Sequence, residues 1–571
     1  MRIRSFLPGE RRIAAAALIV SSITSAFLLV SGPEALAADC PLGAVEWIGA
    51  TAGGDGTTWG DNRNWSTQML PGPADHVCIV SASELTLTPA GTSVQSINAD
   101  PTVSFIFGDD AFSITDTGQP SMIGGDVTMD SLFGSGNLTV AAPTTVGGSL
   151  AMIGGGDAKF TGGVDVAGEI SITGSTALLY LDAPSTTGSL VLDGAFHTSG
   201  IRRTTDATAG SLVVSGPFTW GTGRFEAGIQ VTVNGPSTWN NGTGGTGQIN
   251  SLNTINPPNP TVLTLNGDTT WNSGAIVTSG PSQIVNNATF TINHDAVMAT
   301  AGNPATFTNN ATITVNNTGT TRIEPVFDNN GVLEIGSDSE LNAADYVQSA
   351  DGTLEIELIG DEGPGLGHGY LTGDVELAGT LAIDVQPGFM PVSQSDYELV
   401  VSTGLDVDDL FTTLVDIASG NVEDDPANTA PPNRFDGLGL TWEVDYNVGS
   451  TVNLHLVNVW PLADAGADQI VTVGAPVILD GSGSSDVDGD ILTYDWSITA
   501  TPAGSAAALT GATSVDPQFT PTSPGITQFN WSSTTAPPTP PRTPSPSPPT
   551  LPPTTRRWQQ TTLTPSTRTP S

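Results

Sequence analysis

The chain has 571 residues and a formal net charge of −42 at pH 7, because 57 acidic side chains oppose only 15 Lys and Arg. Such an acidic chain is a poor partner for nucleic acid or an anionic membrane surface, and we expect neither. The 67 glycines, with abundant Thr, Val, Ile and Asn, favour strands and turns over helices. The acidity is explained by solubility alone, or alternatively by cations or a saline environment.

The N-terminus has the pattern of an export signal, residues 1–37. A positively charged start that includes Arg2 precedes an apolar run over 13–30, and a small-residue cleavage site ends at Ala37. We therefore expect export and a mature chain from Ala38. An uncleaved membrane anchor is the alternative. No second apolar run is long enough to span a membrane, so no span is expected after signal removal.

The two cysteines, Cys40 and Cys78, both fall in the first mature segment. In an oxidising exported setting they predict one disulfide that closes an N-terminal cap over residues 38–80. Two unpaired thiols are the alternative. Two cysteines and five scattered histidines do not give the ligand set of a zinc site.

The cap segment contains three tryptophans, an Asn-Trp pair and a Pro-Gly-Pro turn. It reads Trp47, Trp59, Asn64-Trp65, Pro71-Gly72-Pro73 and Asp75-His76-Val77. The pattern resembles the opening of bacterial secreted β-solenoid proteins, including autotransporter-like passengers. The resemblance implies a unit that caps the first coil and buries its indoles. An exposed sugar-binding aromatic patch is the alternative.

Residues 81–345 predict a parallel β-solenoid. One phrase, two asparagines followed by a short alternating strand, recurs at Asn286-Asn287, Asn309-Asn310 and Asn329-Asn330. The starts at 286, 309 and 329 are 23 and 20 residues apart, about one coil of a solenoid. Each coil has an apolar interior that only a neighbouring coil can cover. Asparagines at equivalent positions of stacked coils are expected to form amide ladders.

A second series places tryptophan before Gly- or Asn-rich turns, at Trp220, Trp239 and Trp271. Aromatic contact along successive coils is the first interpretation. Surface platforms that contact a glycan are the second.

The sequence pattern changes over residues 346–457, where the alternating segments are longer, as at 353–358 and 380–385. They resemble the end module of autotransporter-type passengers. The resemblance implies that a last set of coils closes the solenoid here.

Residues 461–525 resemble a PKD domain, a small immunoglobulin-like β-sandwich of extracellular proteins. The matching residues are Ala465-Gly466, Gly474, Leu479 to Asp486, Tyr494-Asp495-Trp496, Pro502 to Ser505, and Phe519. The resemblance implies that Trp496 lies in the core between the two sheets.

Three carboxylates alternate in this domain, at Asp486, Asp488 and Asp490, as they do in calcium loops. However, Gly489 falls at the fourth position, and Ser497 stands where an EF-hand needs Glu. A tight turn with solvated carboxylates is one interpretation and a weak calcium site the other. No other cofactor is expected.

Residues 526–571 contain no Gly, Asp or Glu and are rich in Pro, Thr and Ser. Their composition is typical of a disordered tail. Yet the change at Gly525 cuts the sandwich before its last strands. The codons for Gln528 to Ala536, shifted by one reading frame, allow Val-Gln-Leu-Val-Val-Asn-Asp-Gly, a plausible final strand. We therefore hypothesise a frameshift and a truncated chain. Resequencing the gene tests this hypothesis. An intact reading frame, with residues 526–571 detected by mass spectrometry, would refute it.

No pattern predicts an enzyme. A polysaccharide lyase needs basic residues to neutralise uronate carboxylates, and only seven Lys or Arg lie between Asp39 and Gly525. The one close pair, Arg202-Arg203, is interpreted as a solvated turn. A glycoside hydrolase needs two carboxylates at a fixed separation, and the sequence singles out no such pair.

We therefore expect an all-β protein, secreted or on the cell surface. The first hypothesis is a structural or adhesive protein, with a rigid solenoid that presents a binding face and a PKD spacer module. The alternative is an extracellular polysaccharide-binding accessory protein. The partner in either case is an extracellular glycan or a cell-surface or matrix component. Because function resides in sites carried on such folds, the adhesive assignment is an analogy.

Overall fold

In the computed structural model, the described residues lie between Cys40 and Thr535 and belong to two compact units, with the division between residues 460 and 461. The described range excludes the following gaps: 81–83, 88–90, 117, 132–135, 195–197, 205–209, 241–245, 251–259, 303–304, 361–366, 390, 392–394, 403–409, 418–420, 425–433, 438–439, 448–450, 460, 468, 470, 488, 507 and 524–527.

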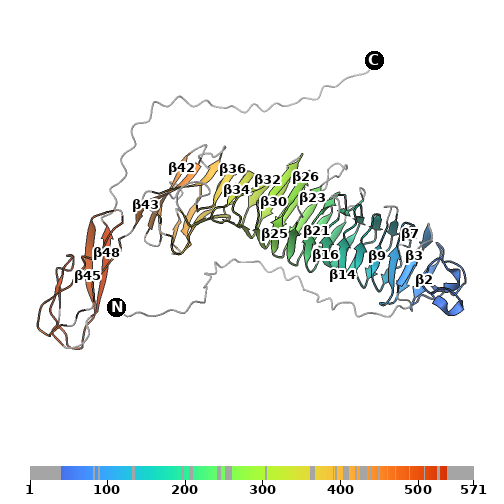
Figure 1. Ribbon diagram of the computed structural model, residues 1–571, viewed down its shortest axis with the longest axis horizontal. Helices are drawn as coiled ribbons and strands as arrows, with labels where there is room; N and C mark the ends of the chain where they lie inside the picture. Colours follow the sequence, from blue (N-terminus) through green and yellow to red (C-terminus); the bar gives the residue numbers. More distant parts are fainter. Residues whose placement is uncertain are drawn as a thin grey trace, which may run out of the picture. The chain divides into compact units, whose positions relative to one another are not determined.

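The first unit is a parallel β-solenoid, as predicted (Figure 1). Its strand pairings form three sheets, a division that the sequence did not predict. Sheet 1 contains β1 (Val45–Glu46), β2 (His76–Ile79), β5 (Ser96–Ala99), β8 (Ser121–Ile123), β11 (Thr144–Val146), β14 (Val164–Ile172), β16 (Pro184–Leu192), β18 (Ser211–Val214), β21 (Gln230–Val233), β24 (Val262–Leu265), β27 (Gln283–Asn286), β30 (Thr306–Asn309), β32 (Thr320–Asn329), β34 (Glu340–Gln348) and β36 (Tyr370–Glu376).

Sheets 2 and 3 share the long strands with sheet 1, because these strands bend from one sheet to the next. Sheet 2 contains β3 (Glu84–Leu87), β6 (Ser104–Phe107), β9 (Val127–Met129), β12 (Leu150–Met152), parts of β14 and β16, β19 (Phe218–Trp220), β22 (Ser237–Asn240), β25 (Thr269–Ser273), β28 (Thr289–Ile292), β31 (Thr312–Val315), β33 (Val332–Ile335), β35 (Thr353–Leu358), β37 (Thr380–Val385) and β39 (Thr413–Asp416). Sheet 3 contains β4 (Thr92–Val94), β7 (Ala111–Ile114), β10 (Asn137–Val140), β13 (Asp157–Phe160), β15 (Leu178–Leu181), β17 (Gly200–Arg202), β20 (Gly223–Glu226), β23 (Thr246–Asn250), β26 (Ala275–Ser279), β29 (Val297–Ala301), parts of β32, β34 and β36, and β38 (Asp396–Ser402).

The alternating sequence explains which side chains enter the core. In β31 the buried residues are Ile313 and Val315, while Thr312 and Thr314 alternate with them and face outward. Ile313 pairs in register with Leu333 on the next coil, which pairs with Leu354 on the one after. Each buried side chain therefore covers its counterpart one coil away, and a single core runs through the solenoid.

Glycine is required where consecutive coils approach closely at a corner. Gly154 and Gly174 occupy equivalent turns, and a Cβ on Gly174 would overlap the carbonyl oxygen of Gly154. This contact explains a glycine repeat of one coil length in the sequence.

Parallel coils continue beyond residue 346, as far as β38 and β39. The pairing then becomes antiparallel: β40 (Asn421–Asp424) pairs with β39, and β43 (Thr451–Val459) pairs with β38. The strands β41 (Arg434–Gly437) and β42 (Leu440–Asn447) extend this antiparallel part. The closing segment expected at residues 346–457 thus combines last coils with an antiparallel cover.

The second unit has two small antiparallel sheets. One contains β44 (Val477–Ile478), β47 (Gln518–Phe519) and β46 (Leu509–Thr510), and the other pairs β45 (Leu492–Ala500) with β48 (Gln528–Thr535). The buried core consists of Val477, Leu479, Trp496 and Phe519. The Nε1 of Trp496 donates to the carbonyl oxygen of Ser514 at 3.1 Å. The expected position of Trp496 in the core is confirmed.

Candidate functional site

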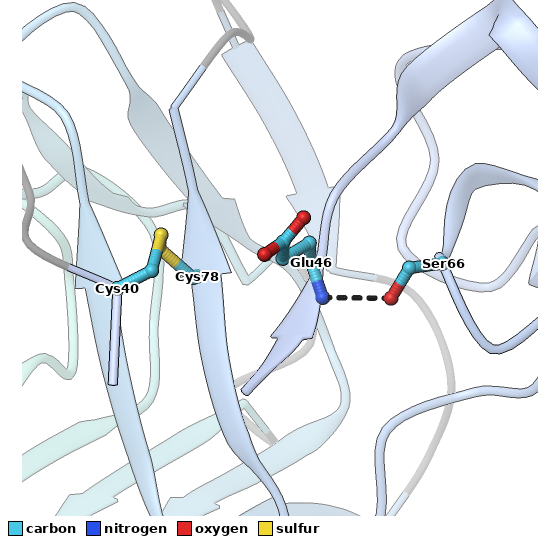
Figure 2. Close-up of a disulfide and its surroundings, with 4 residues drawn as sticks. All are labelled: Cys40, Glu46, Ser66 and Cys78. Carbon is cyan, nitrogen blue, oxygen red and sulfur yellow. Dashed lines mark hydrogen bonds between the residues drawn. A yellow bond between two sulfur atoms is a disulfide. The ribbon is translucent and has the colours of Figure 1, made fainter. Parts of the chain in front are cut away.

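The N-terminal cap is joined to the first coil by a disulfide between Cys40 and Cys78, as predicted (Figure 2). Cys78 lies on β2, and the two Cα atoms are 5.5 Å apart. Beside it, the backbone nitrogen of Glu46 donates to the Oγ of Ser66 at 3.0 Å. The disulfide therefore holds the first described residue to the sheet that starts the solenoid.

The three cap indoles form a buried cluster. Trp59 and Trp65 are fully buried and Trp47 is 3% exposed. The ring centroids of Trp59 and Trp65 are 4.6 Å apart in an edge-to-face arrangement, which is a favourable geometry for aromatic rings. The cap is thus a small core, and these indoles are not an exposed sugar-binding patch.

Asn64 is the last residue of the short helix η2 (Asn62–Asn64) and holds the cap together by bonding to the segment that follows the other short helix, η1 (Gly49–Ala52). Its Nδ2 donates to the Oδ1 of Asp55 at 2.7 Å, and its Oδ1 accepts from the backbone nitrogen of Gly56 at 3.0 Å. Hydrogen bonds from Thr58, Thr57 and Asn64 hold the pKa of Asp55 well below its usual range. The Asn-Trp motif is therefore explained by cap structure.

The proposed glycan contacts Trp220, Trp239 and Trp271 are all fully buried. They lie on the inner face of sheet 2 and meet edge to face, with centroids 5.2 Å apart for Trp220 and Trp239 and 6.0 Å apart for Trp239 and Trp271. A glycan cannot reach them in the folded protein. The hypothesis of surface platforms is wrong for these residues, because every second strand position faces the core. The alternative, aromatic contact along successive coils, is what the structure has.

The first asparagines of the repeated Asn-Asn pairs form a buried ladder on sheet 1. The Nδ2 of Asn286 donates to the Oδ1 of Asn309, and the Nδ2 of Asn309 donates to the Oδ1 of Asn329, both at 2.9 Å. Asn329 continues the chain to the hydroxyl of Tyr346 at 3.1 Å, which donates to Gln348 at 2.7 Å. All these amides are therefore paired inside the core.

The second asparagines form a parallel ladder on the outer surface. The Nδ2 of Asn310 donates to the Oδ1 of Asn287 at 2.9 Å, and Asn330 donates to Asn310 at 3.2 Å. A shorter exposed ladder lies on the edge of sheet 2, from Asn240 through Asn272 to Asn293. The predicted amide ladders are confirmed, and the side chains of each Asn pair point in opposite directions.

An uncharged strip covers part of the outer face of sheet 2, beside this shorter ladder, and the same column of outward residues continues beyond the strip as Glu334 and Glu355. Strand pairing aligns one outward threonine from each of five coils, Thr219, Thr238, Thr270, Thr291 and Thr314. We call this column and the ladder Asn240–Asn272–Asn293 the neutral strip. It contrasts with the acidity of the chain as a whole.

The neutral strip ends at a polar cavity of about 550 Å³ on the corner between sheets 2 and 3. Three successive turns build it, those between β28 and β29, between β31 and β32, and between β33 and β34. We call it the corner groove, and its lining residues are Asn293, His294, Asp295, Asn316, Asn317, Thr318, Ser337 and Asp338.

The acceptors of the corner groove are held in fixed positions. The Oδ1 of Asp295 accepts from the Nδ2 of Asn317 at 2.8 Å, and the Oδ1 of Asp338 accepts from the backbone nitrogen of Gly367 at 2.8 Å. Asn317 is 7% exposed. Asp338 has a φ of 64°, a left-handed conformation that few non-glycine residues adopt. Asp295 is thus oriented by a neighbouring side chain and Asp338 by a backbone N–H before any ligand arrives.

His294 is fixed at one end of the groove. Its Nδ1 lies 3.2 Å from the carbonyl oxygen of Trp271, and its Nε2 lies 3.0 Å from that of Gly274. The ring packs edge to face on the buried indole of Trp271, with centroids 5.3 Å apart. Its position therefore depends on the aromatic core beneath it.

A second, smaller groove of about 200 Å³ adjoins the corner groove and shares Asn316 with it. It is lined by four carboxylates, Glu334, Glu355, Glu357 and Asp384. Burial, and then the charges of Glu334, Asp384 and Glu357, raise the pKa of Glu355 to about 7. We call this the acidic groove.

Replacing Glu355 by glutamine is expected to stabilise the protein at pH 8. The folded-state pKa of about 7 exceeds the ordinary value of 4.5, so this group favours folding at low pH. That contribution is lost as pH rises from 4.5 to 7. We expect a gain on the order of 1 kcal/mol at pH 8, allowing for solvent screening, and none at pH 4. Urea unfolding at both pH values measures it, and an equal effect at both would contradict the assignment.

The pair Arg202-Arg203 does not form a solvated turn. Arg202 lies on β17, and its Nη1 is 3.1 Å from the Oε2 of Glu226, which is fully buried. Arg224 approaches the other carboxylate oxygen at 2.8 Å. Arg203 is 3% exposed, and its Nε donates to the carbonyl oxygen of Ala227 at 2.6 Å. The interpretation as a solvated turn is therefore wrong, because Arg202 pairs with a buried carboxylate and Arg203 is itself buried.

The possible calcium loop is only partly described. The backbone nitrogen of Asp490 donates to the Oδ1 of Asp486 at 3.1 Å, as in a tight turn, and Asp488 lies outside the described residues. Within the described ranges, no group of three or more His, Cys, Asp or Glu is placed to hold a metal ion.

Among the described residues, none of the helices is long and apolar enough to cross a membrane. The export signal at 1–37 falls outside them.

One comparison with known proteins gives a match. Residues 465–539 match a family model whose description is that of a PKD domain. The second unit contains a PKD domain. The match extends beyond Gly525, where the sequence placed the end of the domain, and includes β48. No curated protein matches the chain.

The corner groove was not predicted from the sequence, although polar turns that recur at successive coils indicate its position. Asn293-His294-Asp295, Asn316-Asn317-Thr318 and Gly336-Ser337-Asp338 each follow a strand of sheet 2 at successive coils. Polar turns at a constant interval in a solenoid lie one above the other. That rule would have brought these residues together before the structure did.

Proposed function

We propose that the protein is a secreted or cell-surface structural and adhesive protein. A PKD domain and a β-solenoid suggest an extracellular protein of this kind. In the proposal the solenoid is a stiff support that displays the neutral strip and the corner groove to an extracellular glycan or matrix component. The PKD domain is a spacer module.

The observation that carries the proposal is the continuous pairing of coils beneath a polar surface. Sheet 2 is paired strand to strand from β3 to β39, and the buried amide ladder adds side-chain bonds between coils. Such a core resists bending and opening. The support is suited to holding a surface in place, as an adhesive rod requires.

A polysaccharide-binding accessory protein is the second candidate. The corner groove favours it, since amides, hydroxyls and carboxylates are groups that pair with sugar hydroxyls. The burial of Trp220, Trp239 and Trp271 counts against it, since the expected aromatic platform is not on the surface.

We propose no catalytic role. Arg202 and Arg224 are engaged by the buried carboxylate of Glu226, and so they are poorly placed to neutralise a uronate substrate. Calcium binding at Asp486, Asp488 and Asp490 remains a hypothesis.

Beads coated with the full chain test the proposed function. We expect them to adhere to at least one surface in a panel of extracellular polysaccharides and matrix proteins, and heat-unfolded protein to lose the effect. Release of soluble sugar from the polysaccharides would favour an enzyme instead. A folded protein that adheres to none of the surfaces would overturn the proposal.

A further inference from the structure

We propose that the corner groove is a binding site for a neutral, hydroxyl-rich saccharide, with the neutral strip as its continuation along the solenoid. The proposal rests on the adhesive function above and names the ligand class of that surface.

The groove offers the two kinds of partner that a sugar hydroxyl needs. The carboxylates of Asp295 and Asp338 are acceptors, each fixed through one oxygen by a donor of the protein. The amides of Asn293 and Asn316 and the hydroxyl of Thr318 line the same cavity, and they add donors and further acceptors. A hydroxyl both donates and accepts, so it can use this mixed set fully. Fixing the acceptors beforehand lowers the cost of ordering them on binding.

The lining excludes other common ligands. It contains no aliphatic side chain, so an acyl chain or an apolar peptide would gain little from it. The carboxylates of the groove and the neighbouring cluster of Glu334, Glu355, Glu357 and Asp384 disfavour an anionic ligand. A neutral saccharide meets neither obstacle.

The neutral strip gives the site a direction. It leaves the groove at Asn293 and follows the coils back through Asn272 to Asn240, beside the column of outward threonines. Strands in a sheet are about 4.8 Å apart, so the strip repeats hydroxyl and amide groups at that interval. A linear saccharide can therefore lie along it toward Asn240, while at the opposite end of the threonine column Thr314 lines the acidic groove and donates to Glu334 at 2.7 Å.

Calorimetry with the full chain tests the proposal. The probes are neutral hexasaccharides of glucose, mannose, galactose and N-acetylglucosamine, with a uronate hexasaccharide and calcium chloride as further titrants. We expect wild-type protein to bind at least one neutral probe. Asp338→Asn should weaken that binding about tenfold or more, because it replaces a charged hydrogen-bond acceptor of the groove by a neutral amide. Asn316→Ala should weaken the binding several-fold.

The matched control is Asn310→Ala, which removes an exposed asparagine of the ladder on sheet 1, away from the groove. It should bind like wild type, and thermal melts should show all variants folded. Unchanged affinity in both groove variants would overturn the inference, as would binding of calcium or uronate alone. Failure with every saccharide, in a protein whose beads still adhere to a matrix protein, overturns this inference and leaves the adhesive function standing.

Discussion

Replacing Trp239 by alanine is expected to lower the free energy of unfolding of the solenoid by about 3–5 kcal/mol. The indole is fully buried and meets three aromatic neighbours, two on the adjacent coils and Phe290 on the next coil but one. Its ring centroid lies 5.2 Å from that of Trp220, 6.0 Å from that of Trp271 and 5.0 Å from that of Phe290. Removing the ring leaves a cavity that the hydrogen-bonded coils cannot close. Urea unfolding followed by circular dichroism measures the loss.

The control is Thr238→Ala, the neighbouring residue on the outer face of β22. A substitution there should change the unfolding free energy by no more than about 0.5 kcal/mol. If Trp239→Ala cost as little as this control and abolished glycan binding instead, the indole would be a surface platform after all. The inner face of sheet 2 would then not bury the Trp239 indole.

The second large effect is expected from Asn309→Ala. This side chain accepts from the Nδ2 of Asn286 and donates to the Oδ1 of Asn329, and it also donates to the carbonyl oxygen of Val332 at 3.0 Å. The substitution leaves several buried polar groups unpaired at once. Each costs about 1–3 kcal/mol, so a total loss of about 3 kcal/mol or more is expected in the same urea experiment.

Asn310→Ala provides the comparison, since it removes the same amide from the next position on the exposed ladder. We expect a loss below about 1 kcal/mol, because water replaces the bonds. Equal losses for the two variants would show that the inner ladder has no special role in stability.

The regular part of the fold could be predicted because its signal is repeated. The Asn-Asn phrase returns at 286, 309 and 329, and the strands after it alternate, so both the coil length and the inward positions follow from the sequence. The division into three sheets does not follow, because strands such as β32 bend at a corner without a break in their pattern.

The site was harder to predict because it depends on the geometry of turns. Asn316 and Asn317 are neighbours of the same type, yet Asn316 is exposed and Asn317 is buried beside Asp295. Periodicity distinguishes the faces of a strand but does not orient the residues of a corner. The tryptophan series failed as a glycan site for the opposite reason: periodicity did apply, and it places Trp220, Trp239 and Trp271 inside.

The antiparallel cover at the C-terminal end of the solenoid has a consequence for self-association. In two of the three sheets the last parallel strand is already occupied, β38 by β43 and β39 by β40. A second molecule therefore finds no open backbone there onto which its own coils could add. Deletion of residues 421–459 would uncover these strands and create an end competent for growth into fibrils.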